Sequence, residues 1–313
     1  MGQLMSPKLE ISFLVISILL VFGCSDETED DYQSCGLSSN RLGEYIIVPE
    51  GKFTKSHPEP GSSQGSKNSL KISAFEIQIH EVTNREFRQF VLETGYLTEA
   101  EKSINSDRPD SGSALFVLPL AKAGEQAKKG GADVGWRLLR GATWKQPEGA
   151  NSSIEGLETK PVIHVSLNDA RAYAQWAGAR IPTEIEWQYA ANLGLFDQKN
   201  DMSGAYDRAG KPIANTWQGV FPLFNTAEDG FAGLAPVGCF SDNQIGVFDM
   251  IGNAWEWTET PADYDAFVIK GGSFLCANNF CRRYRPAARE RHDSDFSTNH
   301  IGIRLVRDIA QRG

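Results

Sequence analysis

The sequence has 313 residues, of which 41% are hydrophobic and 23% are charged, so the chain can bury a sizeable core and is not disordered as a whole. Lysine and arginine number 31 against 40 aspartates and glutamates, which gives a net charge of −9. This acidic balance argues against nucleic acid as a partner, because phosphate binding requires a basic surface. The 30 glycines, 14 prolines and 7 tryptophans indicate a fold with many turns, and the 5 cysteines are an odd number that needs explaining.

The N-terminus has the pattern of an export signal. An apolar run over residues 11–22 follows Lys8; at helical rise it spans about 18 Å, too short for a bilayer core of roughly 30 Å, and its length is typical of a signal peptide. Val21-Phe22-Gly23-Cys24 resembles a bacterial lipobox. We therefore expect a lipoprotein-type signal peptide over residues 1–23 and lipidation of Cys24. A plain signal peptide or an uncleaved anchor is the alternative.

This N-terminus predicts where the protein is found and how the chain is divided. We expect an exported protein of the cell envelope, lipid-anchored on the periplasmic or outer side of a bacterial membrane. The acidic residues after Cys24 indicate a solvated tether over residues 24–44. At roughly 150 residues per domain the length allows two domains, but no linker appears after residue 45. We therefore predict one domain over residues 45–310.

The first predicted elements of that domain are two strands and a helix. Residues 45–48 predict a strand, and residues 75–80 alternate apolar with polar side chains as a half-buried strand does. A capping box from Thr83 to Glu86 and the glycine Gly95 bound a predicted helix. Polar and glycine-rich residues 54–69 and 103–160 are expected to be loops.

Two further helices are predicted, one from Ser166 to Gly178 and one from Thr183 to Gly194, each with a capping residue at its start and a glycine at its end. Residues 195–310 show no long helical period and contain short strand-like runs at 267–270 and 301–306. The fold class is therefore α+β: a single irregular domain with few helices and short strands.

The strongest chemical signal is the pair Cys276 and Cys281. In an exported protein two such cysteines most simply form a structural disulfide. Two thiolates would also suit Cu(I), which accepts few and soft ligands, whereas structural zinc requires four. Three neighbouring arginines would favour the thiolate forms if they point inward. The spacing alone leaves both interpretations open.

A second signal is a set of loops rich in asparagine and aspartate, over residues 215–231 and 249–256. Carboxylates, amide oxygens and free carbonyls are the ligands of Ca²⁺, although no EF-hand spacing is present. Solvated turns and side-chain caps explain the same composition and are favoured on composition alone. The five histidines show no ligand spacing.

Several motifs, taken together and in order, resemble the formylglycine-generating enzymes, or sulfatase-modifying factors. The resemblance covers residues 45–308 and implies the C-type-lectin-like fold of that family. It is carried by Gly-Asn-Ala-Trp-Glu-Trp at 252–257, Gly-Gly-Ser at 271–273 and Gly-Ile-Arg at 302–304, and by residues 94–102, 161–166, 177–184 and 215–231.

The resemblance changes the interpretation of the cysteine pair. Cys276 and Cys281 match the family's catalytic pair, which favours a redox metal site over a disulfide. The family implies that they hold Cu(I), with O₂ as co-substrate, and oxidise a cysteine in a Cys-x-Pro-x-Arg motif of an unfolded sulfatase polypeptide to formylglycine. Other positions match the family's catalytic or substrate pocket: Ser273 and Trp255 on the catalytic side, and Ser297, His300 and Phe280 on the substrate side.

Structural calcium is also implied by the family. Two sets of ligands match. One is formed by Asn215, the Thr216 carbonyl, Asp229 and the Phe231 carbonyl. The other is formed by Asp249, the carbonyls of Gly252 and Ala254, and Glu256.

The chain departs from the family pattern at Phe280, where tyrosine is usual, and at His300, where asparagine is usual. These changes leave the polarity and pH dependence of the pocket open. Cys35 and Cys239 are either bridged or two separate thiols. The expected protein is a monomer whose partners are a sulfatase and, through its anchor, a membrane. The alternatives are a non-catalytic lipoprotein of this fold, acting in envelope binding or assembly, and a related oxidase of a different thiol.

Overall fold

The computed structural model describes residue 2 and residues 35–54, 69–104, 112–117, 135–193, 204–281 and 283–309. The predicted signal peptide, Cys24 and the tether up to residue 34 lie outside these ranges, so those expectations stay predictions. In the part of the chain that is described, no helix has both the length and the apolar character needed to cross a membrane. From Cys35 onward the chain forms one compact unit.

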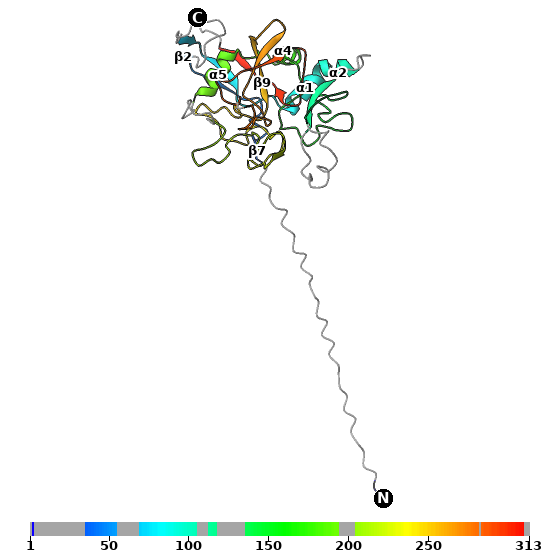
Figure 1. The fold of residues 1–313 in the computed structure, drawn as a ribbon. Helices are drawn as coiled ribbons and strands as arrows, with labels where there is room; N and C mark the ends of the chain where they lie inside the picture. Colours follow the sequence, from blue (N-terminus) through cyan, green and yellow to red (C-terminus); the bar gives the residue numbers. More distant parts are fainter. Residues whose placement is uncertain are drawn as a thin grey trace. The chain divides into compact units, whose positions relative to one another are not determined.

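Two small sheets organise this unit. The first has three antiparallel strands with β4 in the centre, and the second has four strands in which β12 lies parallel to β9. Figure 1 shows β9 in the middle of the unit, with α1 and α2 to one side and α5 and β2 to the other. The first sheet is β1 (Tyr45–Val48), β4 (Phe75–Gln78) and β13 (Val306–Asp308); the second is β11 (Glu290–Asp293), β10 (Ala266–Lys270), β9 (Trp255–Pro261) and β12 (Ile301–Gly302).

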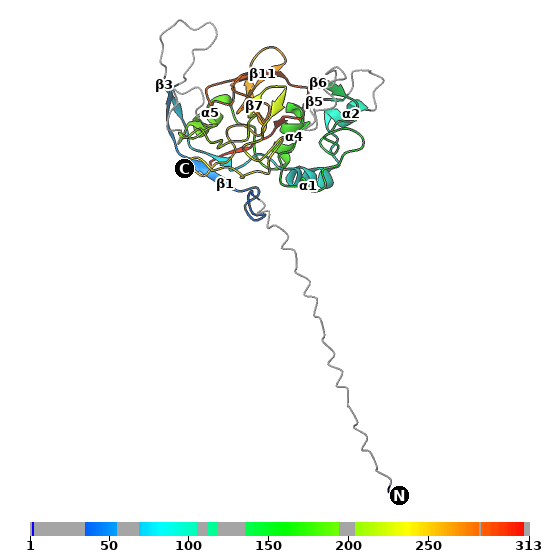
Figure 2. The same ribbon diagram turned by 60° about the horizontal axis from the view of Figure 1, so that its bottom comes forward.

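Three two-stranded hairpins stand apart from these sheets. Figure 2 shows β5 and β6 beside α2, and β3 on the opposite side near α5. The hairpins are β2 (Gly51–Thr54) with β3 (Ser69–Ile72), β5 (Ser113–Val117) with β6 (Gly135–Leu139), and β7 (Gly219–Val220) with β8 (Phe224–Asn225).

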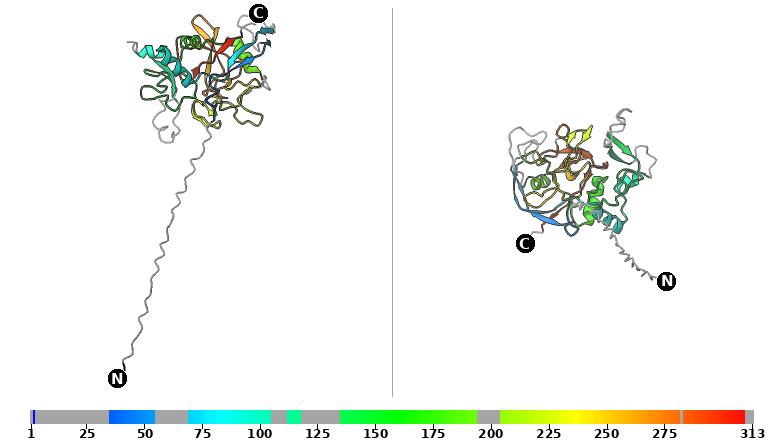
Figure 3. Two further views of the ribbon diagram at one scale, coloured as in Figure 1. Left: turned by 180° about the vertical axis from the view of Figure 1, so that it is seen from behind. Right: turned by 90° about the horizontal axis from the view of Figure 1, so that it is seen from below.

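The helices confirm the predicted capping signals. Helices α1 (Asn84–Thr94), α4 (Leu167–Trp176) and α5 (Glu184–Asn192) each begin with a complete capping box, in which the N-cap hydroxyl and the third helical residue bond each other's backbone N–H. Gly95 ends α1 in the left-handed region at φ 68°. A short helix α2 (Glu99–Ile104) was not predicted. Figure 3 shows from behind and from below that α1 and α2 stay on one side of the unit.

Two strand predictions need correction. Residues 75–80 do not form a half-buried strand, because Gln78 and His80 are 1% and 0% exposed. The His80 ring is buried by bonding within the fold: Nε2 accepts from the Gly43 N–H at 2.9 Å, and Nδ1 lies 2.6 Å from the Glu81 carbonyl. Residues 301–306 form no single strand but supply β12 to one sheet and the start of β13 to the other.

The core has one large and two smaller parts. The large part joins α1 and α4 to β9 and contains Cys276. A second lies under α5 and the three-stranded sheet. A third gathers Phe116 and Trp217 around the segment that contains Phe274 and Ala277. The predicted α+β fold, a single domain with few helices and short strands, is confirmed. Cys276 belongs to the large part of the core, and its neighbours Leu275 and Ala277 belong to the third.

Cys35 and Cys239 form a disulfide, across 204 residues of sequence, which settles the alternative left open for them. The Leu37 N–H also donates to the Val237 carbonyl at 3.0 Å. The chain is therefore attached to the domain from Cys35 onward, within the segment expected to be tether.

Candidate active site at the Cys276–Cys281 pair

The two cysteines are brought together by a tight turn. The backbone N–H groups of Ala277 and Phe280 donate to each other's carbonyls at 2.8 and 3.1 Å, which folds the chain back on itself. As a result the Sγ atoms of Cys276 and Cys281 lie 2.9 Å apart, well beyond the S–S bond length of about 2.05 Å. Both are free thiols, Cys276 buried and Cys281 partly exposed. Cys281 has φ 56°, a left-handed backbone that a non-glycine residue adopts at a cost of about 1 kcal/mol or more.

The surroundings give the two thiols different acidities. A hydrogen bond from the Cys276 thiol lowers the pKa of Cys281 to about 7, helped by the backbone N–H and the positive charge of Arg283. Burial raises the pKa of Cys276 well above its usual value, and its neighbour Cys281 adds to the effect. Arg283 also pairs with Glu290. Arg282 lies outside the described residues. The pair therefore offers one accessible thiolate beside one buried thiol.

Ser273 is bonded to the backbone of the pair, and Trp255 lies in the same core cluster as Cys276. Both are buried, at 0% and 2% exposure. The Ser273 carbonyl accepts from the Cys276 N–H at 2.9 Å, and its hydroxyl oxygen accepts from the Leu275 N–H at 3.2 Å. Trp255 shares the large core cluster with Cys276. Gly272, with φ 76°, has no room for a side chain, because a Cβ there would lie 2.7 Å from the Tyr284 backbone.

An aromatic ladder extends from the turn. The Phe280 ring is 55% exposed and stacks on Phe221, with ring centroids 4.5 Å apart and planes 6° apart. Phe221 stacks on Phe116 at 5.1 Å, Phe116 meets Trp136 at 5.3 Å, and Trp136 meets His300 at 4.8 Å. The predicted pocket residues Phe280 and His300 are thus the two ends of one ladder.

The polar residues of the predicted pocket are held inside the protein. Ser297 is 3% exposed and donates its hydroxyl to Ser113 Oγ at 2.8 Å, while Ser113 Oγ lies 2.7 Å from His164 Nδ1. The His300 Nδ1 atom lies 2.6 Å from the Thr298 hydroxyl. Burial lowers the pKa of His300 well below its usual value, so the ring is neutral at pH 7. The titratable group that the sequence adds at this position therefore carries no charge there.

The first predicted calcium loop has the oxygen chemistry that calcium requires. Asn215 is 1% exposed and its Oδ1 atom has no hydrogen-bond partner in the described structure. Burial raises the pKa of Asp229, whose Oδ2 accepts from the Thr216 N–H at 3.0 Å and from Gln218 Nε2 at 2.8 Å. The same Gln218 nitrogen also donates to the Thr216 carbonyl. Asp229 Oδ1 accepts from the Phe231 N–H at 2.9 Å. An orphaned buried oxygen beside a carboxylate fits Ca²⁺.

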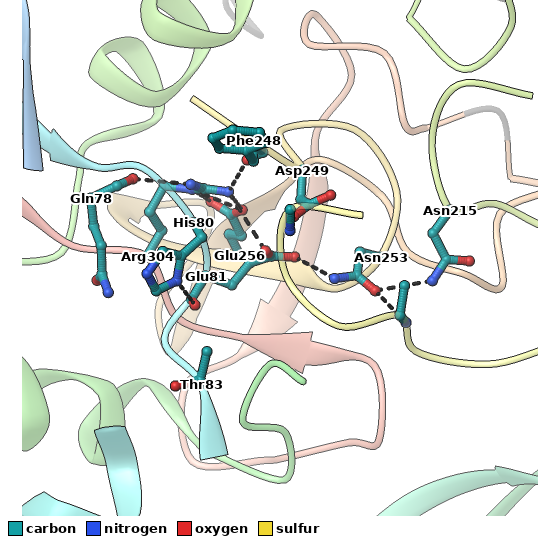
Figure 4. Close-up of polar contacts among 12 residues, drawn as sticks. Gln78, His80, Glu81, Thr83, Asn215, Phe248, Asp249, Asn253, Glu256 and Arg304 are labelled. Atoms are coloured by element: carbon teal, nitrogen blue, oxygen red, sulfur yellow. Dashed lines mark hydrogen bonds and ion pairs between the residues drawn. The ribbon is translucent and has the colours of Figure 1, made fainter. Parts of the chain in front are cut away.

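The second predicted loop is arranged differently. Figure 4 shows Arg304 bound to the Glu256 carboxylate and to the carbonyls of Gln78 and Phe248. Glu256 accepts three bonds from Arg304 at 2.7–3.0 Å and one from Trp187 Nε1 at 2.5 Å, which fills the roughly four acceptor positions of a carboxylate. A calcium ion at Glu256 would have to displace one of these donors.

The other members of the second set have different surroundings, and Gly252 is the one that packs against the first loop. Asp249 Oδ2 accepts from the Gly238 N–H at 2.6 Å. Gly252 has φ 77°, and a Cβ there would lie 2.1 Å from the Asn215 carbonyl, so the two loops pack backbone to backbone. Ala254 is buried. Because the Glu256 carboxylate is already bonded to Arg304 and Trp187, whereas Asn215 Oδ1 has no partner in the described structure, the second set fits calcium less well than the first.

Sequence reasoning missed the middle of the ladder. Phe116, Trp136 and Phe221 come from β5, β6 and the β7–β8 hairpin, and no local pattern connects them. Nor did the sequence indicate that Arg304 is buried at 0% exposure against Glu256. The only signals available were the tryptophan in a segment expected to be loop and the arginine of the Gly-Ile-Arg motif.

Comparisons with known proteins agree with this geometry. The formylglycine-generating enzyme of Bos taurus is 39% identical over 288 residues, covering 84% of this chain and 74% of that protein. The enzyme of the same name from Thermomonospora curvata is 37% identical and is covered to 93%. The inactive C-alpha-formylglycine-generating enzyme 2 of Mus musculus is 36% identical over 269 residues, covering 83% of this chain and 84% of that protein.

Among solved structures, PvdO from Pseudomonas aeruginosa matches with a TM-score of 0.54 at 20% identity, covering 85% of this chain and 94% of that chain, which supports the fold alone. Residues 35–309 match the family described as "Sulfatase-modifying factor enzyme 1-like domain". The chain belongs to this family and is related to both active and inactive formylglycine-generating enzymes.

Proposed function

We propose that the protein oxidises a cysteine of an unfolded sulfatase polypeptide, in a Cys-x-Pro-x-Arg motif, to formylglycine. The observation that carries the proposal is the pair of free thiols 2.9 Å apart, one buried and one partly exposed, in a chain 37–39% identical to formylglycine-generating enzymes. A pair with a structural role alone has no need of one accessible thiol of lowered pKa.

The donor set of Cys276 and Cys281 suits Cu(I), which prefers few and soft ligands. When bound, copper would supply the redox chemistry with O₂ and a free position for the substrate thiol. Cys281 is the residue that the substrate reaches first, because its side chain is partly exposed whereas Cys276 is buried. The ladder that begins at Phe280 would exclude water from one side of the reacting cysteine and orient the chain that carries it.

The reaction balances with one external reductant. Oxidation of CH₂–SH to a thioaldehyde removes two electrons and two protons, and hydrolysis of the thioaldehyde by water gives CH=O and releases the sulfur as H₂S. O₂ accepts these two electrons and two more from a pair of external thiols, and both of its oxygen atoms leave as water. Calcium would be structural, held by Asn215 and Asp229.

A peptide assay tests the proposal. The protein is loaded with Cu(I) and given O₂, a thiol reductant and a peptide containing Cys-x-Pro-x-Arg. We expect the peptide to show the mass change that replacement of CH₂–SH by CH=O produces, and to react with a hydrazine. The control is a peptide with alanine in place of proline. A copper-loaded protein that leaves the motif peptide unchanged would refute the proposal.

A non-catalytic role in envelope binding or assembly is the second candidate, because the chain is also 36% identical to a protein described as inactive. It predicts that copper is not bound at the thiol pair and that replacing both cysteines preserves the function in the cell. Copper titration of the wild type and the double variant separates the two proposals.

We further propose export and lipid anchoring through Cys24. Cells supplied with a labelled fatty acid should incorporate the label into the wild type but not into the Cys24→Ala variant. Release of both proteins into the soluble fraction alike would contradict the anchor.

A further inference from the structure

The tip of the β7–β8 hairpin carries three exposed large apolar side chains within five consecutive positions. Val220, Leu223 and Phe224, here called the apolar tip, are 42%, 70% and 51% exposed. Single exposed apolar residues are ordinary, but a cluster of them on one loop indicates a surface that meets another molecule.

The apolar tip is continuous with the candidate active site. Phe221, from the same hairpin, stacks on Phe280 at 4.5 Å, and Phe280 directly precedes Cys281. Leu223 is two residues beyond Phe221, which adds at most about 7 Å of chain. The apolar surface therefore begins at Phe280, next to Cys281 in the chain. It extends as far from Cys281 as an extended polypeptide reaches in roughly five residues.

The hairpin is held in place by the loop between the two cysteines. Asn279 Oδ1 accepts from the Phe221 N–H and Asn279 Nδ2 donates to the Phe221 carbonyl, both at 3.2 Å. On the other side, Trp217 Nε1 donates to the Phe224 carbonyl at 2.9 Å. A surface that is already ordered in this way loses little conformational entropy when it binds a partner.

We propose that the apolar tip is a specificity determinant: it binds a large apolar side chain of the substrate polypeptide within about five residues of the reacting cysteine. The inference rests on the proposed function, because that function requires an extended polypeptide at Cys281. Residues that flank the reacting cysteine must cross the adjoining surface, and the surface on this side is apolar. An extended apolar segment is therefore the occupant whose chemistry and path match.

The experiment measures binding rather than turnover. Fluorescent peptides contain Ser-x-Pro-x-Arg in polar flanks, so that they cannot be oxidised. One leucine is then moved through the five positions before the serine, the two x positions and the position after the arginine. Copper-loaded wild type is compared with Val220→Ser/Leu223→Ser, which keeps the stacked rings of Phe221 and Phe280. The matched control is Leu92→Ser on α1, where the leucine is 72% exposed.

We expect leucine at one or more positions to tighten peptide binding by about tenfold, as partial burial of one such side chain would. This gain should be the same for the wild type and for Leu92→Ser. The gain should disappear in the tip variant, whose affinity for the all-polar peptide stays unchanged. A gain that no position shows, or that survives in the tip variant, overturns the inference.

Two further measurements distinguish loss of the tip's role from loss of the proposed function and from self-association. Conversion of a polar-flanked cysteine peptide, read by mass spectrometry, tests the proposed function by itself. Turnover without any leucine effect refutes the tip alone, and absence of turnover together with absence of binding refutes both. Sedimentation of each variant detects a second copy of the chain as the occupant. Self-association that the tip variant loses while its peptide affinities match those of the wild type also overturns the inference.

Discussion

The two cysteine pairs of this molecule have opposite fates. Cys35 and Cys239 are bonded to each other across 204 residues of sequence, whereas Cys276 and Cys281, only five positions apart, remain thiols. The first pair joins the segment at Leu37, whose N–H donates to the Val237 carbonyl, to a loop in which the Gly238 N–H donates to the Asp249 carboxylate. The second lies between the large core and an aromatic surface.

The difference lies in what surrounds each pair. Around Cys276 and Cys281, burial raises the pKa of Cys276 while a hydrogen bond and Arg283 lower the pKa of Cys281, and the neighbouring Phe280 ring is exposed. The bonded pair restricts the unfolded chain, whereas the thiol pair keeps one partly exposed thiol of lowered pKa, as the proposed oxidation requires. Separation in sequence alone would have predicted the reverse assignment, because close cysteines bridge most easily.

The largest expected effect separates the pairs by activity. Cys281→Ser should reduce peptide oxidation by more than about a hundredfold, since even groups that only support a metal ligand contribute 10- to 100-fold. Cys35→Ser/Cys239→Ser should retain oxidation at a temperature where it is folded. Mass spectrometry of the peptide gives the rates, and circular dichroism verifies folding. Equal losses in both variants would remove the distinction between the two pairs.

Local signals predicted the helices, because a capping box needs only four consecutive residues: Thr83 to Glu86 located the start of α1 correctly. The cysteine pair was also a local signal, because Cys276 and Cys281 are only five positions apart. In contrast, the ladder joins Phe116 to Phe221 and Trp136 to His300, contacts that depend on the tertiary fold. The resemblance to a family was enough to predict the two cysteines of the candidate site. The aromatic surface around them could be identified only from the structure.

The next effect, on stability, should appear in the other pair. A disulfide that closes a long loop contributes about 2–5 kcal/mol, mainly by restricting the unfolded chain. Cys35→Ser/Cys239→Ser should lower the free energy of unfolding by this amount in urea under non-reducing conditions. Cys281→Ser should change it by less than about 1 kcal/mol. If a dithiol leaves wild-type stability unchanged, the bridge makes no contribution.

Acid should weaken the buried polar cluster of His164, Ser113 and Ser297. Burial lowers the pKa of His164 to about 4, while its unfolded value is about 6.5. The neutral ring therefore contributes stability that is complete above pH 6.5 and is lost as the pH falls toward 4, in total about 3 kcal/mol. Urea unfolding between pH 7 and 4 measures the loss. In His164→Gln the change of the free energy of unfolding with pH should correspond to one proton fewer taken up on unfolding. An unchanged slope in that variant would assign the acid sensitivity to other groups.

The smallest expected effect distinguishes the two oxygen-rich loops. Calcium at about one hundred times its dissociation constant stabilises a protein by about 2.7 kcal/mol, and we expect this response to be lost in Asp229→Asn because the first loop has the free Asn215 oxygen. Glu228→Gln, an equal change of charge at the exposed neighbouring position, should keep it. Melting temperatures with calcium and with a chelator give the comparison. The Glu256 carboxylate is fully used by Arg304 and Trp187, so Asp249→Asn should also keep the calcium response. The opposite result, a response lost in Asp249→Asn and kept in Asp229→Asn, would place the ion in the second loop, with Arg304 displaced from Glu256.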